Sequence, residues 1–285
     1  MKAMKPLHLY KEEAKKTPKH LGHEYMIFEK YDGWYGYYEN GHIHSFADRI
    51  IPSVQWLADK LEEQFRFHGI TGRLVFEILL SDVEDFHTLN GILNRRSEAA
   101  TTAYLRVHDY LPETSEEHTN SKRYELAEYI TNNINLKCVK IAPVLEKSSD
   151  VSKWREVCFA LWAQGAEGII AKQCDGLYKW GGRDATMLKI KLECTFEAVV
   201  VGLAQGKANG KYETTLGALL VRTSDDVVHT VSGMTDRERE LWWSDHNQIV
   251  GAVVECQAMQ KLTDGTYREP RYKAVRHDKN FKDID

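Results

Sequence analysis

The sequence lacks long apolar segments. It has no uninterrupted apolar stretch at its N-terminus and no run of about 18 apolar residues anywhere in its 285 residues. We therefore expect no secretory signal and no membrane-spanning helix, and we predict a cytoplasmic protein without membrane attachment.

Cysteine is scarce and unpaired in its spacing. Five cysteines are scattered along the chain, an odd number that includes no Cys-x-x-Cys pair. This pattern argues against a zinc site and against a disulfide framework, and it suits a reducing compartment.

The chain also lacks a strong charge of one sign. Its formal net charge is −4, with 28% charged and 42% hydrophobic residues, which is typical of a globular protein of one large or two smaller domains. Residues 1–20 are the local exception, with six lysines against two glutamates. We consider two interpretations of this segment: a solvated, partly frayed end, or a basic contact for a polyanion.

Residues 1–193 indicate an α+β domain with antiparallel character. Strands are predicted on both sides of Lys30 within 24–38, and Asn40-Gly41 predicts a hairpin turn. A helix is expected over 53–66, with Ser53 as N-cap and Gly69 beyond its end. The remaining expected strands are 42–47, 73–80, 103–110, 137–144 and 168–173, and the remaining helices are 84–94, 121–132 and 150–164.

Residues 194–285 have a different pattern, with short strands separated by Gly-rich turns. One helix interrupts them, and it starts at the capping box from Thr235 to Glu238. The five expected strands are 196–203, 216–222, 226–232, 250–259 and 271–276. They predict a small Greek-key barrel of the oligonucleotide-binding (OB) type as a second domain.

Short polar motifs occur in a fixed order along the chain. Lys30 precedes a tight Asp-Gly turn at the end of an apolar strand, a placement that can hold an amine rigidly beside a nucleotide phosphate. It is followed by Glu77 in an apolar strand, Glu167-Gly-Ile-Ile-Ala-Lys172, Lys189-Ile-Lys191 and Arg276-His-Asp-Lys279.

Each motif alone has a plainer interpretation. Lys30 alone is compatible with an exposed turn lysine, Glu77 with a salt bridge at a sheet rim, and Glu167 with a helix end before glycine. Lys189 and Lys191 alternate on a strand and so share a face, directed at a phosphate or at solvent. The Arg276 motif alone is compatible with a surface ion-pair cluster.

Taken together, these motifs resemble the ATP-dependent DNA ligases, in particular the small two-domain enzymes of bacteriophages and some bacteria. The resemblance runs from about Phe28 to Lys279. It implies a nucleotidyl transferase domain followed by an OB-fold barrel, with ATP and Mg²⁺ (or Mn²⁺) as cofactors. The implied reaction seals nicks in duplex DNA through lysyl-AMP, AMP transfer to the 5′-phosphate and attack by the 3′-hydroxyl. It also implies a monomer that serves DNA repair, replication or recombination.

The resemblance also assigns roles to residues. Lys30 would be the nucleophile, assisted by Lys189 and Lys191. The metal would be held by Asp32, Glu77 and Glu167. The nucleotide would be bound by Glu29, Tyr31, Arg49, Glu77, His108, Glu167, Lys172, Lys189, Lys191, Arg276 and Lys279.

The chain departs from the ligase pattern in three places. Tyr35 stands where the lysine motif usually has an arginine, and Val-Phe-Glu ends at Glu77 where Asp-Gly-Glu is usual. His108 takes the place of the aromatic residue that stacks on adenine, with Tyr104 and Tyr110 as alternatives.

Other functions share these motifs. A GTP-dependent mRNA capping guanylyltransferase has the lysine motif, the lysine pair and the barrel, so nucleotide choice separates it from a ligase. An RNA ligase fits less well, because Arg-x-Asp-Lys in a C-terminal barrel is not its usual pattern. A non-catalytic nucleic-acid-binding relative would have an inert Lys30. For DNA contacts we expect the basic N-terminus and the loop from Lys207 to Lys211.

Overall fold

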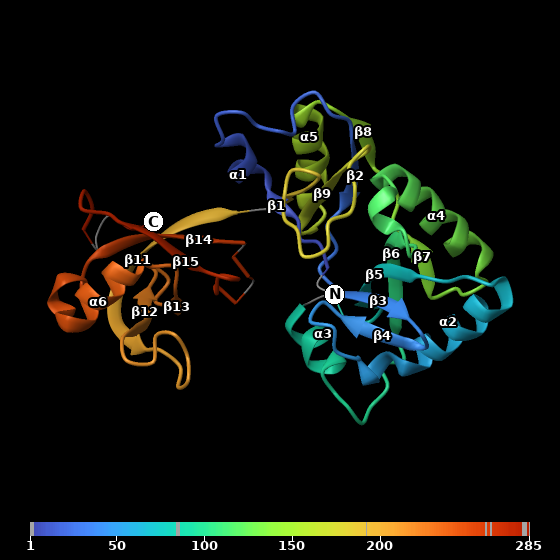
Figure 1. The fold of residues 1–285 in the computed structure, drawn as a ribbon. Coiled ribbons are helices and arrows are strands. Elements are labelled where there is room, and N and C mark those ends of the chain that lie inside the picture. The colour runs from blue at the N-terminus through green and yellow to red at the C-terminus, as the bar shows by residue number, and fades with distance from the viewer. Residues whose placement is uncertain are drawn as a thin grey trace. The chain divides into compact units, whose positions relative to one another are not determined.

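The structure is a computed structural model that describes residues 3–83, 86–191, 193–259, 261–262, 264–280 and 284. It divides into two compact units, Met1–Lys191 and Leu192–Asp285, a boundary two residues before the expected one (Figure 1). The described residues form three five-stranded sheets, two in the first unit and one in the second. No helix in these residues is long and apolar enough to cross a membrane.

The first sheet of the first unit has the strand order β1-β10-β9-β2-β8. Its strands are β1 (Leu7–His8), β2 (Tyr25–Glu29), β8 (Glu146–Ser148), β9 (Gly168–Gln173) and β10 (Met187–Lys191). Only β1 pairs in parallel, with β10. Helix α5 (Val151–Trp162) packs Trp154 and Cys158 into a core with Tyr25, Ile27 and Leu188. The short helix α1 (Leu9–Glu13) adds Leu9 to the same core.

The second sheet has the order β4-β3-β5-β6-β7. Its strands are β3 (Trp34–Glu39), β4 (His42–Ser45), β5 (Arg73–Leu80), β6 (Ala103–Leu111) and β7 (Val139–Ile141). The helices of this part are α2 (Gln55–His68), α3 (Phe86–Leu93) and α4 (Asn120–Asn133), and a 3₁₀ turn, η2 (Ser115–Glu117), precedes α4.

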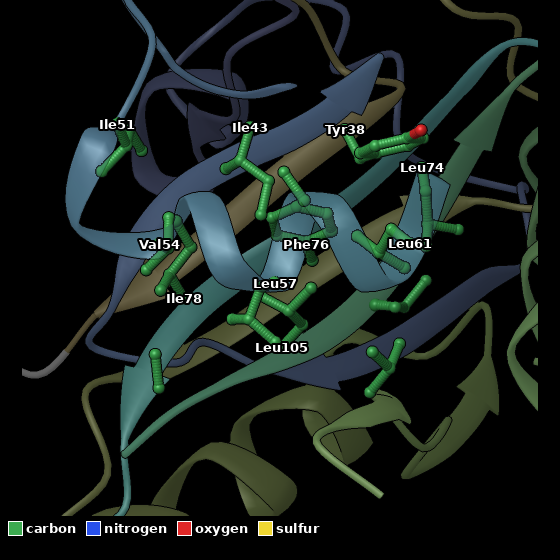
Figure 2. Close-up of a cluster of buried hydrophobic side chains, with 14 of the residues drawn as sticks. Tyr38, Ile43, Ile51, Val54, Leu57, Leu61, Leu74, Phe76, Ile78 and Leu105 are labelled. Atoms are coloured by element: carbon green, nitrogen blue, oxygen red, sulfur yellow. The ribbon is translucent and has the colours of Figure 1, made fainter. Parts of the chain in front are cut away.

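One face of this second sheet is covered by α2. Leu57 and Leu61, one helical turn apart, pack against Phe76 and Ile78 of β5 (Figure 2). Successive residues of a strand face opposite sides, so Val75 and Glu77 lie on the other face. That second face supplies residues to the candidate site.

Two predictions from local turn signals, the hairpin at Asn40-Gly41 and the glycine beyond the helix end, are confirmed, and one is wrong. Asn40 and Gly41 both have positive φ, 48° and 77°, as a tight hairpin turn requires. Gly69, the C-cap that follows α2, has φ 62°. The prediction of Ser53 as N-cap is wrong. A 3₁₀ turn, η1 (Pro52–Val54), precedes the helix, and the buried Ser53 hydroxyl donates instead to the Leu93 carbonyl at 2.8 Å.

The interpretation of the N-terminus as a frayed end is also wrong for its described part. Ala3 and Met4 are each only 5% exposed, and Leu7–His8 forms β1 against β10. Six lysines suggested a solvated tail, but the few apolar residues between them anchor the segment.

The second unit is a single antiparallel sheet with the order β13-β12-β11-β14-β15. Its strands are β11 (Cys194–Gln205), β12 (Leu216–Arg222), β13 (Val228–Val231), β14 (Val253–Ala258) and β15 (Arg271–Val275). Helix α6 (Asp236–Ser244) begins with the predicted capping box, and its Trp242 joins the core; η3 (His246–Gln248) follows it. In the described residues one parallel bridge, Ser232 to Arg271, links the two edge strands, so the barrel is not closed by a continuous ladder.

Candidate active site

A cavity of about 370 Å³ lies within the first unit. Both sheets and the N-terminal segment contribute to its wall. The residues that line it are Met4, Lys5, Pro6, Phe28, Glu29, Lys30, Tyr31, Tyr35, Phe46, Val75, Glu77, His108, Asp109, Ala142, Ile170, Lys172, Tyr178, Met187, Lys189 and Lys191. Of the thirteen residues predicted for the site, eight therefore meet in one cavity.

The position of Lys30 is fixed by three strand ends that meet. Its backbone N–H donates to the Gly168 carbonyl at 2.8 Å, and Gly168 pairs with Lys191 across β9 and β10. Gly168 has φ 147°, and a Cβ there would lie 2.1 Å from the Ile190 carbonyl oxygen. Only glycine permits this close approach, so the glycine of the Glu-Gly motif is what brings the three strand ends together.

Glu167 links two of the predicted lysines. One carboxylate oxygen lies 2.5 Å from the Lys30 amine and the other lies 2.5 Å from the Lys191 amine. The Glu167 side chain is only 4% exposed. It is therefore the buried anchor of a lysine pair, and the interpretation as a plain helix end is wrong.

Lys189 is the third lysine of this group. Burial lowers its pKa to about 8, and the neighbouring charges of Lys191 and Lys30 act in the same direction. Lys189 and Lys191 both line the cavity, so this face of β10 is not a purely solvated one. Amines that lie this close together repel one another and can bind a polyanion such as a chain of phosphates.

Glu77 lies in the middle of the second sheet, opposite Tyr35 on β3 and Arg106 on β6. Its Oε2 is enclosed and has no hydrogen-bond partner among the described residues. Burial raises the pKa of Glu77 to about 8, and the charge of Lys30 opposes this rise. The Lys30 turn packs closely against this sheet at Gly33. A Cβ there would lie 2.6 Å from the Ile78 carbonyl oxygen, so only glycine allows this approach.

The unpartnered oxygen of Glu77 fits a divalent cation. Mg²⁺ is usually held by one or two carboxylates together with waters and substrate phosphates. Both Glu167 oxygens already pair with lysines, and Asp32 does not line the cavity. In the described part of the chain no group of three or more His, Cys, Asp or Glu side chains is placed to hold a metal. Of the three predicted metal ligands, Glu77 therefore remains as the candidate.

Lys172 belongs to a buried charge network. Its amine donates to the His108 carbonyl at 2.8 Å and to Asp109 Oδ2 at 3.2 Å, and Asp109 also accepts from Arg123 Nε at 3.0 Å. Despite its burial, the two cations lower the pKa of Asp109 to about 2, while burial lowers the pKa of Lys172. Sequence reasoning missed Asp109; a carboxylate inside an apolar strand was its only signal.

The aromatic part of the cavity includes His108. Burial and the charge of Lys172 lower its pKa to about 3, so the ring is neutral at pH 7. Its centroid lies 6.2 Å from that of Tyr35. The alternatives Tyr104 and Tyr110 do not line the cavity, and the Tyr110 hydroxyl donates to the Thr71 carbonyl instead.

Other predicted residues divide between the cavity and its surroundings. Glu29 and Tyr31 line the cavity, and burial raises the pKa of both. Arg49 does not. It is exposed and lines a second depression of about 500 Å³ together with Arg96.

Arg276 and Lys279 form a separate cluster in the second unit. Both pair with Glu197 of β11, at 2.5 Å and 2.7 Å, and Arg276 also contacts Asp278 at 2.7 Å. The shared carboxylate holds the two cations side by side.

Comparison with known proteins identifies the fold. The family model of the DNA ligase OB-like domain matches residues 207–276. No curated protein matches the chain. Among solved structures, a Lig E DNA ligase has a TM-score of 0.75 and 16% identity, with 97% of this chain and 99% of that chain covered.

Two further structures agree with this result. The Chlorella virus DNA ligase-adenylate has a TM-score of 0.53 and 20% identity, over 98% of this chain and 99% of that one. The ATP-dependent DNA ligase of bacteriophage T7, in complex with ATP, has a TM-score of 0.54 and 17% identity, over 96% and 98%. The chain thus has the fold of a nucleotidyl transferase joined to an OB-like domain. More particularly, it is the fold of these DNA ligases over nearly their whole length.

Proposed function

We propose that this chain is an ATP-dependent DNA ligase that seals nicks in duplex DNA through a lysyl-AMP intermediate. The observation that carries the proposal is the buried Glu167 carboxylate, which holds the amines of Lys30 and Lys191 at 2.5 Å in a cavity with Lys189. The similar structures, two of them described with ATP or as the adenylate, support the choice of nucleotide and reaction.

In the first step the Lys30 amine attacks the α-phosphorus of ATP. A phosphorus–nitrogen bond forms, the bond to the bridging oxygen breaks, and pyrophosphate leaves. The Lys30 amine must give up a proton, and Glu167 Oε2 is its nearest acceptor. Catalysis of such a substitution consists mainly of positioning and charge neutralisation.

The residues around Lys30 supply both contributions. Gly168 and Glu167 fix the position of the amine, and Lys189 and Lys191 supply positive charge for the phosphates. Mg²⁺ held by Glu77 and the phosphates would add further charge neutralisation. The neutral ring of His108 faces the cavity as a surface on which adenine can stack.

In the later steps AMP passes to the 5′-phosphate of a nick and the 3′-hydroxyl displaces it. A ligase must be indifferent to sequence, so we expect its contacts to go mostly to phosphate and sugar. Arg49 and Arg96 in the second depression and the loop from Lys207 to Lys211 are the cations we assign to the DNA backbone. We assign Arg276 and Lys279 to the pyrophosphate during the first step.

The proposed enzyme acts as a monomer on nicked duplex DNA in repair, replication or recombination. All five of its cysteines are free thiols, which suits the reducing cytoplasm.

Sealing of a labelled nick tests this function. Wild-type chain with ATP and Mg²⁺ is expected to join a nicked duplex, and Lys30→Ala is expected to leave it open. Lys60→Ala, at an exposed position of α2, is the matched control and should seal normally. Equal sealing by wild type and Lys30→Ala would rule out Lys30 as the nucleophile.

A further inference from the structure

The N-terminal segment from Met4 to Pro6 forms part of the wall of the cavity that contains Lys30. None of these residues belongs to the ordered motifs. They reach the cavity because β1 pairs in parallel with β10, the strand that carries Lys189 and Lys191, with His8 opposite Lys189.

Met4 and Lys5 are each held by a specific contact. The Met4 N–H donates to the Tyr178 hydroxyl at 3.0 Å, and the Met4 side chain packs with Tyr178 and Met187. The Lys5 N–H donates to the Gly182 carbonyl at 2.9 Å. The segment is therefore a fixed part of the site, and its side chains have defined positions.

The Lys5 amine lies over the ring of Phe46, another residue of the cavity wall. The ammonium lies 4.2 Å from the centroid of the Phe46 ring, and Phe46 in turn packs edge-on against Tyr35 at 5.5 Å. Phe46 and Tyr35 both line the cavity. A lysine amine over an aromatic face can still accept an anionic partner.

The lysines that line the cavity differ in whether they pair with a carboxylate. Lys30 and Lys191 are paired with Glu167, and Lys172 is paired with Asp109. Lys5 and Lys189 line the same cavity, and neither makes an ion pair with any residue that the structure describes. A lysine that lines a cavity without a carboxylate partner can bind an incoming anion without first breaking an ion pair.

We propose that Met4, Lys5 and Pro6 form a wall of the nucleotide-binding site, and that Lys5 binds the phosphates of the nucleotide. This inference rests on the proposed ligase function. The inference adds a binding residue outside the motifs. Its segment leads into β1, which pairs with β10, the strand of Lys189 and Lys191. Lys5 acts on the phosphates that leave as pyrophosphate, so it has no part in the sealing of a nick that already carries AMP.

Two substrates separate this role from a contact with DNA. With ATP and Mg²⁺, self-adenylation of Lys5→Ala is expected to need an ATP concentration for half-maximal rate about tenfold above wild type, with the maximal single-turnover rate changed far less. Lys5→Arg keeps the charge and is expected to restore most of the affinity. With a nick that already carries the 5′-adenylate, and without ATP, Lys5→Ala is expected to seal within about twofold of wild type.

Lys16→Ala is the matched control, because Lys16 is an exposed lysine of the same N-terminal region that does not line the cavity. A half-saturating ATP concentration in Lys5→Ala equal to that in Lys16→Ala would overturn the inference. Equal losses of self-adenylation and of sealing of the adenylated nick would also overturn it and make Lys5 a DNA contact. Failure of the wild type itself to adenylate would instead contradict the ligase function.

Discussion

The Lys30 amine lies 2.5 Å from Glu167 Oε2, and the other oxygen of the same carboxylate lies 2.5 Å from the Lys191 amine. Glu167 thus connects the nucleophile motif to the lysine pair through one buried group. The Lys30 and Glu167 motifs lie side by side because the carbonyl of Gly168, the residue after Glu167, accepts a hydrogen bond from the Lys30 N–H.

Loss of the Glu167 carboxylate should impair adenylation. In Glu167→Ala both lysines lose their common partner, and a misplaced nucleophile costs roughly 100-fold in rate. We expect a fall of that size in the single-turnover rate of AMP transfer to Lys30. Glu63→Ala, an exposed position on α2, is the control. A wild-type rate in Glu167→Ala would show that the Lys30 amine is positioned without it.

Gly168 should tolerate no side chain. Gly168→Ala places a Cβ 2.1 Å from the Ile190 carbonyl oxygen, and we expect a loss of about 3 kcal/mol in unfolding free energy together with loss of adenylation. Gly165→Ala is the matched control. Gly165 also has a positive φ, 85°, but an added Cβ there meets nothing within 4 Å, so we expect a loss of about 1 kcal/mol. Equal losses in urea unfolding would mean that the close approach is not the cause.

Lys189 should reduce stability near neutral pH. Its pKa is about 8 in the folded chain and about 10.4 when unfolded, so between these values the unfolded chain binds more protons and stability rises with pH. The side chain is half-buried and solvent screens part of the penalty. We expect Lys189→Met to be more stable than wild type at pH 7 by about 1–2 kcal/mol, and to lose adenylation activity.

The measurement for Lys189 is urea unfolding at pH 7 and at pH 10.5. The stability difference between the variant and wild type is expected to shrink to a few tenths of a kcal/mol at about pH 10.5, where the amine is neutral in the folded state and about half neutral in the unfolded state. A difference that stays constant with pH would assign the effect to packing.

Asp109 should stabilise the first unit above the pH at which carboxylates titrate. Its pKa is about 2 when folded and about 3.9 when unfolded, so its contribution is fully present above pH 4 and is lost as the pH falls towards 2. Asp109→Asn leaves Lys172 and Arg123 buried without their anion, and we expect a cost of about 3 kcal/mol at pH 7.

Two comparisons check the Asp109 prediction. The gap in unfolding free energy between wild type and Asp109→Asn should narrow between pH 4 and pH 2. Asp59→Asn, exposed on α2, should change stability by less than about 0.5 kcal/mol at any pH. A gap that does not narrow would mean that the carboxylate charge contributes nothing.

The sequence predicted those parts of the fold and site that depend on local signals. Strand alternation places Lys189 and Lys191 on one face, and the turn residues Asn40 and Gly41 define their hairpin within a few residues. The ordered motifs bring Lys30 and Glu167 into one site. Such signals are contained in short stretches of chain.

Features that depend on distant partners were not predicted. Asp109 acts through Arg123 and Lys172, which are 14 and 63 residues away, and its strand gives no sign of either. The pairing of β1 with β10 spans nearly the whole first unit, so the basic residues around Lys5 suggested a tail. Arg49 stays outside the cavity because its loop after β4 leads to the second depression.

The most direct test is covalent labelling of the chain. Freshly purified protein, first treated with pyrophosphate to remove any bound AMP, is incubated with Mg²⁺ and separately labelled ATP, GTP or NAD, and then denatured and resolved by electrophoresis. We predict acid-labile label from ATP alone, present in wild type and absent in Lys30→Ala. Label from GTP would indicate a capping guanylyltransferase, and no label from any nucleotide would contradict the enzymatic account.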